Sequence, residues 1–294
     1  MNITAIIVTY NRSELLRECI DAIRTMSARP SKIIIVDNAS TDGTAQYLNE
    51  LGSDPLFKVA TLEKNAGGAG GFAHGIRLAM QEQCDWVWIM DDDTIPQHDT
   101  LAKLCDKIGD DPTIGFASSR VIWTDGADHI MNIPKFTSAV DERSGCQLLR
   151  SASFVSIMIK KDVVRAIGLP YKEFFIWHDD AEYTQRITQS GKKGIYVPES
   201  VTIHKTKENY GPAVDTAPIS TAWKFYYGQR NSMFINRQKY GNGILFMIKE
   251  LNHLRLNLHK ANKRPSSERK TFKKQILRGF WDGLSFKPEI EYVQ

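Results

Sequence analysis

Three adjacent carboxylates, Asp91, Asp92 and Asp93, directly follow a short apolar run that begins at Trp86. Such a run is typical of a buried strand. Three carboxylates side by side repel one another, so a cation is expected to offset the repulsion. Oxygen ligands suit a hard divalent ion such as Mg²⁺ or Mn²⁺. We therefore expect a metal at this position and a phosphate on the metal; the plainer alternative is a solvated turn.

A glycine-rich stretch from Asn65 to Gly71 is the second candidate site. Glycine lets the backbone approach a ligand closely, and a loop at a helix N-terminus suits an anion or a sugar-phosphate. Asn65, Gly67 and Gly68 are therefore candidate contacts for such a sugar-phosphate. A flexible turn is one alternative, and a dinucleotide fingerprint is another, because Gly68-x-Gly70-x-x-Ala73 fits that pattern. We favour the fingerprint less, since it follows the third predicted strand and leaves the other carboxylates without a purpose.

The run Trp177-His178-Asp179-Asp180 places two carboxylates at the start of a predicted helix. One of them is expected to cap the helix. The other is a candidate general base, because an inverting sugar transfer needs a group that takes the proton from the acceptor hydroxyl. A cation would stabilise the charge on the departing diphosphate. Trp177 offers an apolar face for a sugar ring, although a place in the core is equally common for tryptophan.

Two single residues could support these sites. His204 follows a short strand after the acidic pair, where a third metal ligand could come from; a structural or exposed histidine is expected just as often. Arg230 lies in a stretch of positive charge and aromatic side chains, residues 224–231, and is a candidate contact for the diphosphate.

The elements that must position these residues alternate along the chain. Strands separated by helices predict βαβ units in an α/β fold with a mostly parallel sheet covered on both faces. Because the carboxyl ends of parallel strands meet at one edge, Asp37, the glycine stretch and Asp91 should collect there. Pro198 is expected to stop a late strand, Gly194 to Val197. The earlier predicted strands are residues 4–10, 32–36, 57–62, 86–90 and 114–123.

Composition narrows the class of protein. The 294 residues are 42% hydrophobic and 24% charged, as is ordinary for a soluble protein, and the net charge of +4 is too mild to indicate nucleic acid. The four cysteines form no CxxC pair, which suits a reducing cytoplasm. We find no signal peptide and no apolar run long enough to span a bilayer. A cytoplasmic location is therefore expected.

Three runs of residues resemble one family. Residues 6–12, residues 36–44 and the aspartate triplet look like a family 2 glycosyltransferase with the GT-A fold, over roughly the first two-thirds of the chain. The glycine stretch, the run Met90-Asp91-Asp92-Asp93 and the later Trp-His-Asp-Asp-Ala-Glu-Tyr are similar to the galactofuranosyltransferase branch. Rhamnosyltransferases of the same family are close neighbours.

The resemblance implies a GT-A, Rossmann-like fold and a transfer that inverts the anomeric carbon without a covalent sugar–enzyme intermediate. The donor would be UDP-galactofuranose, and the acceptor a hydroxyl of a growing bacterial surface glycan, with a lipid-linked glycan among the candidates. Carried over by motif, the implied roles are nucleoside contacts by Thr9 and Asp37, a ribose contact by Asp92, metal ligation by Asp91, Asp93 and His204, base catalysis by Asp180, and an acceptor contact or structural role for Asp179.

Three other functions remain open from the sequence. The first is a rhamnosyltransferase that uses dTDP-rhamnose. The second, from another enzyme class, is a nucleotide-dependent oxidoreductase. The third is a nucleotide-sugar-binding protein that keeps the fold but lacks turnover.

The character of the chain changes near residue 220. Residues 1–219 are expected to form the catalytic domain, and residues 220–294 a helical, basic C-terminal extension. Basic residues interleaved with aromatic ones suit an anionic membrane surface, which would place the protein peripherally on the inner face of the cell membrane. A helical cap with an ordinary solvated face explains the same pattern equally well.

Overall fold

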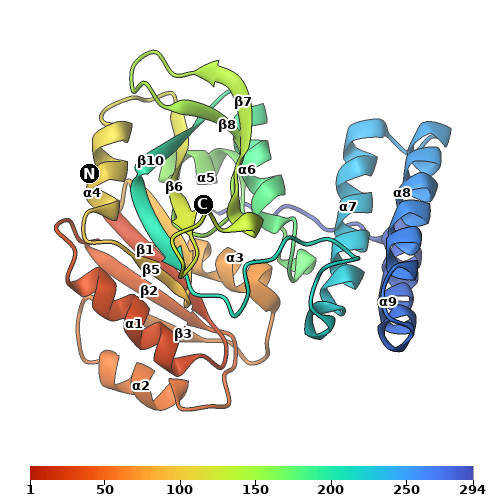
Figure 1. The fold of residues 1–294 in the computed structure, drawn as a ribbon. Helices are drawn as coiled ribbons and strands as arrows, with labels where there is room; N and C mark the ends of the chain where they lie inside the picture. The colour runs from red at the N-terminus through yellow and green to blue at the C-terminus, as the bar shows by residue number, and fades with distance from the viewer. Residues whose placement is uncertain (294) are drawn as a thin grey trace. The chain divides into compact units, whose positions relative to one another are not determined.

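The first part of the chain folds around one mixed sheet, shown in Figure 1. The computed structural model describes residues 1–293. Within them the strand order is β3-β2-β1-β4-β9-β6-β10-β8-β7, and β5 pairs with the end of β10. The strands are β1 (Ile3–Thr9), β2 (Lys32–Asp37), β3 (Phe57–Thr61), β4 (Trp86–Asp91), β5 (Thr94–Pro96), β6 (Ile114–Ile122), β7 (Lys135–Val140), β8 (Gln147–Ser151), β9 (Ile157–Lys160) and β10 (Lys193–His204).

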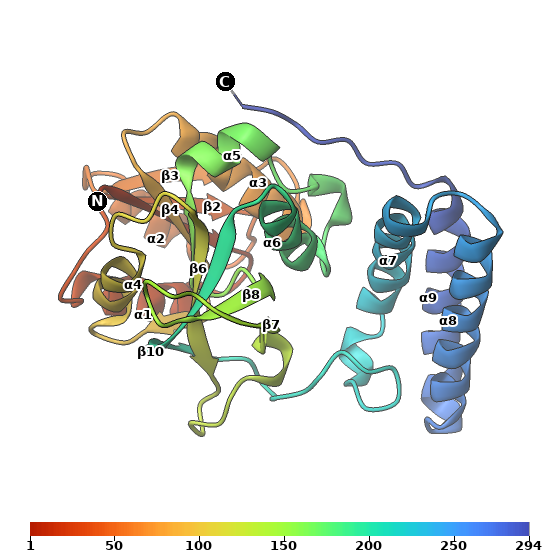
Figure 2. The same cartoon turned by 90° about the horizontal axis from the view of Figure 1, so that it is seen from above.

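Helices cover both faces of this sheet, as Figure 2 shows. Alternate residues of β1 and β2 point to opposite faces, so each face carries its own apolar core. One core joins the sheet to α1 (Ser13–Arg24), α2 (Thr44–Leu51) and α4 (Thr100–Ile108). The other joins it to α3 (Gly67–Met80), α5 (Lys161–Ile167) and α6 (Asp179–Gln189). The predicted α/β class, with helices on both faces, is confirmed.

The sheet is parallel only in part, which corrects the expectation of a mostly parallel sheet. Strands β3, β2, β1 and β4 are parallel to one another. The next strand, β9, runs antiparallel between β4 and β6. The β7–β8 pair is also antiparallel. The chain reverses direction here because β9 follows a hairpin rather than a βαβ crossover.

The glycine stretch is helical rather than a loop. Helix α3 begins at Gly67, whose φ of 72° favours glycine. Farther along, a Cβ on Gly71 would lie 2.5 Å from Val8 Cγ1, and one on Gly75 would lie 2.4 Å from Ile6 Cγ2. These glycines therefore let α3 pack directly on β1, a structural role that the sequence pattern did not reveal.

The sequence pattern suggested that Pro198 would stop the last long strand, but the strand continues past it. β10 runs from Lys193 to His204, and its pairing with β6 shifts register between Val197 and Val201. Proline is tolerated at such a bulge because no ladder hydrogen bond is needed there. The bulge lets the strand continue to His204.

The contacts divide the chain into two compact units at different places from the expected boundary at residues 219 and 220. The first unit comprises Met1–Lys172, Asp180–Asn209 and residues 290–293. The second comprises Glu173–Asp179 and Tyr210–Glu289. It contains three helices, α7 (Lys224–Tyr240), α8 (Ile244–Asn262) and α9 (Ser266–Ser285), packed around apolar side chains such as Phe225, Phe272 and Phe280.

Short 3-10 turns occur at Ile130–Asn132, Lys172–Phe174 and Ile219–Thr221. Among residues 1–293, every helix is too short or too polar to pass through a bilayer.

Candidate metal and nucleotide-sugar site

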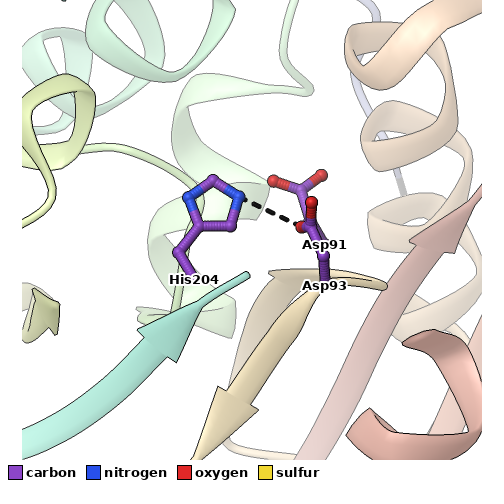
Figure 3. Close-up of side chains that lie close together, drawn as sticks. All are labelled: Asp91, Asp93 and His204. Atoms are coloured by element: carbon purple, nitrogen blue, oxygen red, sulfur yellow. Dashed lines mark ion pairs between the residues drawn. The ribbon is translucent and has the colours of Figure 1, made fainter. Parts of the chain in front are cut away.

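Asp91, Asp93 and His204 come together although more than a hundred residues separate the triplet from the histidine. Asp91 ends β4, and Asp93 immediately precedes β5. Strand β5 pairs antiparallel with the end of β10, where Thr94 lies opposite His204. Figure 3 shows the imidazole directed toward the two carboxylates. One ligand atom from each of the three side chains lies within 4.8 Å of the others.

Asp93 is buried between two cationic partners. Its Oδ1 lies 3.0 Å from His204 Nε2, and its Oδ2 contacts the guanidinium of Arg12. Burial alone would raise the pKa of Asp93, but His204 and Arg12 outweigh it and hold that pKa well below its usual range. The pKa of His204 is in turn raised, because Asp93 and Asp91 outweigh the effect of burial. Asp93 is thus a carboxylate at neutral pH.

Asp91 is destabilised as an anion when no further cation is present. Burial, followed by the charge of Asp93, raises the pKa of Asp91 to about 7. A divalent cation between the two carboxylates would reverse this effect, since it would favour both charged forms.

The donor set fits a divalent metal. Two carboxylates and one imidazole nitrogen suit Mn²⁺ or Mg²⁺ better than a soft ion. The Oδ1 atom of Asp93 is fully buried, and its ion pair with His204 Nε2 does not have hydrogen-bond geometry. A metal held by Asp91, Asp93 and His204 would satisfy this oxygen.

Asp92, the middle residue of the triplet, is used within the protein. Its Oδ2 accepts a hydrogen bond from Thr9 Oγ1 at 2.8 Å and one from the backbone N–H of Tyr10 at 3.3 Å. Its Oδ1 accepts from Arg12 at 3.2 Å. Asp92 and Thr9, both predicted to contact the nucleoside, therefore join the ends of β4 and β1. Arg12, to which the sequence assigned no role, bridges Asp92 and Asp93.

Asn132 and His129, which the sequence did not single out, both contact His204. The Nδ1 atom of His204 lies 2.8 Å from Oδ1 of Asn132, and Asn132 Nδ2 donates to Ser153 Oγ at 3.0 Å. The ring of His129 lies 4.6 Å from that of His204, and burial lowers the pKa of His129 to about 4. These residues lie in an irregular segment that carries no periodic pattern.

Asp37 lies at the carboxyl end of β2, as predicted. It is buried; its Oδ1 accepts from the backbone N–H of Ser40 at 3.0 Å, while its Oδ2 has no partner. A buried carboxylate oxygen without a donor is suited to a ligand N–H or hydroxyl.

The start of α3 is held by two asparagines. Asn65 Oδ1 accepts from the backbone N–H of Gly67 at 2.7 Å. Asn38 Oδ1 accepts from Ala66 at 3.3 Å, and Asn38 Nδ2 donates to the carbonyl of Gly67 at 3.2 Å. Asn38, which the sequence did not single out, thus links the end of β2 to the predicted donor contacts Asn65, Gly67 and Gly68.

The two aspartates at the start of α6 differ in environment. Asp179 is buried, while Asp180 is partly exposed. Desolvation nevertheless raises the pKa of Asp180 to about 6, opposed by the N–H of Ala181 and by the charge of Lys135. A carboxyl group with such a pKa can accept a proton near neutral pH.

Trp177 and Arg230 both have contacts inside the helical unit. The Trp177 ring lies edge to face with Phe225 at 4.9 Å, so one side of the indole is occupied by protein. The guanidinium of Arg230 donates to the carbonyls of Glu173 and Phe174 and lies 3.9 Å from the ring of Phe286. The Arg230 contacts therefore occupy some of the N–H groups that would be needed to bind a diphosphate.

Comparison with known proteins identifies the family. The model described as "Glycosyl transferase family 2" matches residues 4–168. The chain belongs to glycosyl transferase family 2. The matched residues include the whole aspartate triplet, β1 from Thr4 onward, and all of β2, β4 and α3.

Within family 2 the chain is similar to curated galactofuranosyltransferases. It is 27% identical over 203 residues to galactofuranosyltransferase GlfT1 of Mycolicibacterium smegmatis, covering 64% of this chain and 66% of that protein. It is 28% identical over 212 residues to GlfT1 of Mycobacterium tuberculosis, covering 65% and 66%. The alignments therefore span just under two-thirds of these relatives.

Solved structures show the same fold. The mannosyltransferase PcManGT from Pyrobaculum calidifontis, in complex with GDP-Man and Mn²⁺, matches with a TM-score of 0.60 and 18% identity, over 97% of this chain and 87% of that one. Staphylococcus aureus TarS 1-349, in complex with UDP-GlcNAc, matches with a TM-score of 0.58 and 13% identity, over 97% and 90%. The GT-A fold expected from the sequence of this family 2 member is confirmed.

Proposed function

We propose that the protein is a metal-dependent, inverting glycosyltransferase that moves galactofuranose from UDP-galactofuranose onto a hydroxyl of a bacterial surface glycan. The convergence of Asp91, Asp93 and His204 at the ends of β4 and β10 carries this proposal. It is the arrangement that a nucleotide-sugar transferase needs to hold a cation against a diphosphate. The similarity to galactofuranosyltransferases supports the choice of donor.

The metal, Mn²⁺ or Mg²⁺, would be held by Asp91, Asp93 and His204. When bound, it supplies positive charge that stabilises the departing diphosphate. Asp93 is poised for this role because His204 and Arg12 keep it ionised in advance. Arg230 is retained as a candidate diphosphate contact through whichever of its N–H groups remain available.

The nucleoside half of the donor would lie along the ends of β1 and β2. The unpartnered Oδ2 of Asp37 is the candidate acceptor for a base or ribose hydrogen bond. Asn65, Gly67 and Gly68 at the start of α3 would approach the sugar-phosphate. Thr9 and Asp92 would contact the nucleoside and its ribose while they remain hydrogen-bonded to each other. This hydrogen bond fixes the two strand ends beside the nucleoside.

Asp180 would take the proton from the acceptor hydroxyl while that oxygen attacks the anomeric carbon from the face opposite the diphosphate. Its raised pKa suits this role, because the carboxylate is basic enough to accept the proton and still ionised at pH 7. Asp179 and Trp177 would contact the acceptor sugar.

A membrane contact through the helical unit is part of the proposal. On α8, Ile244, Leu245, Ile248 and Leu251 are each at least half exposed. The only carboxylate of α8, Glu250, is buried and accepts from Asn236. The exposed face of α8 is therefore apolar and basic, as an anionic lipid surface requires.

Helix α9 adds positive charge to the same unit. Arg269, Lys270, Lys273 and Lys274 line a groove along it with Ser266 and Leu277. Its acidic residues are engaged within the unit, since Glu268 pairs with Arg264 and Asp282 accepts from Tyr226. A lipid-linked acceptor could then be met at the inner face of the cell membrane by a protein that approaches from the cytoplasm.

A donor panel with a metal titration tests the activity. The release of nucleoside diphosphate is measured with UDP-galactofuranose, dTDP-rhamnose and UDP-glucose, with and without Mn²⁺, in the presence of bacterial glycan acceptors. Metal-dependent release with UDP-galactofuranose is expected, and it should be lost in Asp91→Asn but not in the exposed control Asp110→Asn. Release with dTDP-rhamnose instead would favour the rhamnosyltransferase.

Thermal shift separates the other classes. UDP with Mn²⁺ should raise the melting temperature and NADH should not, because a ligand stabilises only the state that binds it. Stabilisation by NADH without metal would indicate an oxidoreductase. UDP-sugar binding without transfer to any acceptor would indicate a binding protein.

Vesicle sedimentation tests the membrane contact. The protein should sediment with phosphatidylglycerol-containing vesicles and much less with phosphatidylcholine alone. Ile248→Glu should weaken this binding, whereas Val140→Glu, an equally exposed apolar residue on β7, should not. Equal binding by wild type and Ile248→Glu would contradict a contact through this face.

A further inference from the structure

The segment just before the two aspartates of α6 has an unusual backbone. Phe175, Trp177 and His178 have φ values of 65°, 65° and 70°. Side chains other than glycine rarely adopt this region, and bulky aromatic residues disfavour it most. Such conformations persist only when surrounding contacts hold them. The contacts that hold this segment are therefore of interest.

The side chain of Asn231, in the middle of α7, supplies the central contacts. It is fully buried, and its Nδ2 lies within hydrogen-bond distance of three carbonyl oxygens of the segment. These belong to Phe174 at 3.0 Å, Ile176 at 3.2 Å and Trp177 at 2.9 Å. One amide group thus gathers carbonyls from both sides of the left-handed residue Phe175.

The neighbouring arginine fixes the orientation of this amide. Arg230 Nε and Nη2 donate to Asn231 Oδ1 at 3.1 and 3.0 Å, so Nδ2 must face the segment. Arg230 Nη2 also donates to the carbonyls of Glu173 and Phe174. The two residues act on the same stretch of backbone.

Two aromatic side chains of the segment also pack against α7. A Cβ on Gly228 would lie 2.8 Å from Cε3 of Trp177, so the indole rests directly on the backbone of α7. Phe175 stacks on Tyr227 with ring centroids 4.7 Å apart. One turn of α7, residues 227–231, therefore holds both the backbone and the aromatic side chains of the segment.

We propose that Asn231 is a positioning residue for acceptor transfer: by holding residues 174–178 in their left-handed path, it sets where Trp177 and Asp179, the first residue of α6, are presented. The inference rests on the proposed function, because it takes Trp177 and Asp179 as acceptor contacts. Asn231 itself is fully buried and would not reach the acceptor. It acts through the segment.

The test compares Asn231→Ala and Asn231→Asp with Asn242→Ala, an exposed asparagine in the turn between α7 and α8. Asn231→Asp keeps the size of the side chain but replaces its donor with an acceptor that repels the carbonyls. We expect kcat for transfer to fall by roughly tenfold to 100-fold in both variants, because small misplacement of catalytic groups is costly. The Kd for Mn²⁺ should stay within about twofold, since the proposed metal ligands Asp91, Asp93 and His204 are not in contact with Asn231.

Hydrogen–deuterium exchange gives a readout that does not depend on activity. Peptides covering residues 173–180 should exchange faster in both Asn231 variants, while peptides from β1, β2 and β4 should be unchanged. This pattern also separates a local effect from general unfolding. Unchanged exchange in this segment together with wild-type kcat would overturn the inference.

A glycine substitution probes the backbone mechanism itself. Glycine adopts positive φ readily, so Asn231→Ala should increase exchange less in a His178→Gly background than in the wild-type background. The comparison needs four proteins: wild type, the two single variants and the double variant. An undiminished increase would overturn the claim that Asn231 holds the left-handed path. If wild type transfers no sugar, the proposed function fails, whereas the exchange measurements still decide the role of Asn231 in holding the segment.

Discussion

Asn132 Oδ1 lies 2.8 Å from Nδ1 of His204, on the side of the ring that faces away from the carboxylates. The carboxamide oxygen can only accept, so Nδ1 carries the proton of this hydrogen bond. Nε2 is consequently the nitrogen directed toward Asp93, 3.0 Å away. Outer partners of this kind fix the orientation and tautomer of a metal-binding histidine.

Replacing Asn132 with alanine should weaken metal binding about tenfold, since losing such an outer partner typically costs 10–100-fold in affinity. Titration of Mn²⁺ into the protein, followed by electron paramagnetic resonance of the free ion, measures the change. Asn49→Ala, an exposed substitution on α2, serves as the control. Equal affinities in the Asn132 variant and wild type would show that the hydrogen bond does not support the site.

Arg12→Ala should destabilise the metal-free protein, because Asp92 and Asp93 would lose their shared cation. The expected loss is about 1–2 kcal/mol, less than for a fully buried pair because solvent screens the arginine. The Arg12 side chain is 48% exposed. Urea unfolding in EDTA measures the loss, and Mn²⁺ should diminish it by supplying a replacement cation.

The surface pair of Arg24 and Asp54 offers a matched control. The two groups lie 3.4 Å apart and are about equally exposed. Arg24→Ala should cost at most about 1 kcal/mol, with or without Mn²⁺. An Arg12 effect that Mn²⁺ leaves unchanged would contradict the role of Arg12 as a counter-ion.

Gly75→Ala should lower the free energy of unfolding by about 1–3 kcal/mol, although alanine is the better helix former. The added Cβ would lie 2.4 Å from Ile6 Cγ2 and 3.2 Å from Val36 Cγ2. Gly68→Ala, whose Cβ would meet only Phe72 at 3.8 Å, should be neutral or stabilising. Urea unfolding of the two variants compares them, and similar destabilisation of both would refute close packing of α3 as the reason for Gly75.

Transfer should depend on pH through Asp180. The folded-state pKa is raised to about 6, so kcat at saturating Mn²⁺ should fall as pH decreases below that value and the base becomes protonated. Lys135 favours the carboxylate by its charge. Lys135→Gln should therefore move the acid limb of the profile to higher pH, whereas Lys103→Gln on α4 should not. A profile that is flat between pH 5 and 7 would exclude Asp180 as the titrating base.

Much of the first half of the fold could be predicted from local patterns. Runs such as Ile33-Ile34-Ile35-Val36 are apolar on both faces because helices cover the sheet on both sides. The position of Asp91 at a strand end follows from the same pattern. Its meeting with His204 does not, because it depends on β5 pairing with β10 across the sequence.

The features of the structure that differ from the sequence-based predictions depend on packing between residues far apart in the chain. Gly71 ends the stretch that the sequence predicts as a loop, yet Gly71 and Gly75 permit close contact between α3 and β1. Pro198 reads as a strand terminator, but a bulge accommodates it. Asn132 and Asn231 carry no local signal, because an asparagine that holds a distant ring or loop cannot be distinguished in sequence from one on the surface.

The antiparallel strand β9 also has a consequence for biosynthesis. Trp86 of β4 pairs with Lys160 of β9, so the outer edge of the strand Trp86–Asp91 stays bare until the ribosome has extended the chain well past α4. Pairings so distant in sequence close slowly, and an apolar edge awaiting its partner invites aggregation. Nascent chains that stall before β9 should consequently depend on chaperones, whereas those that have emerged beyond it should not.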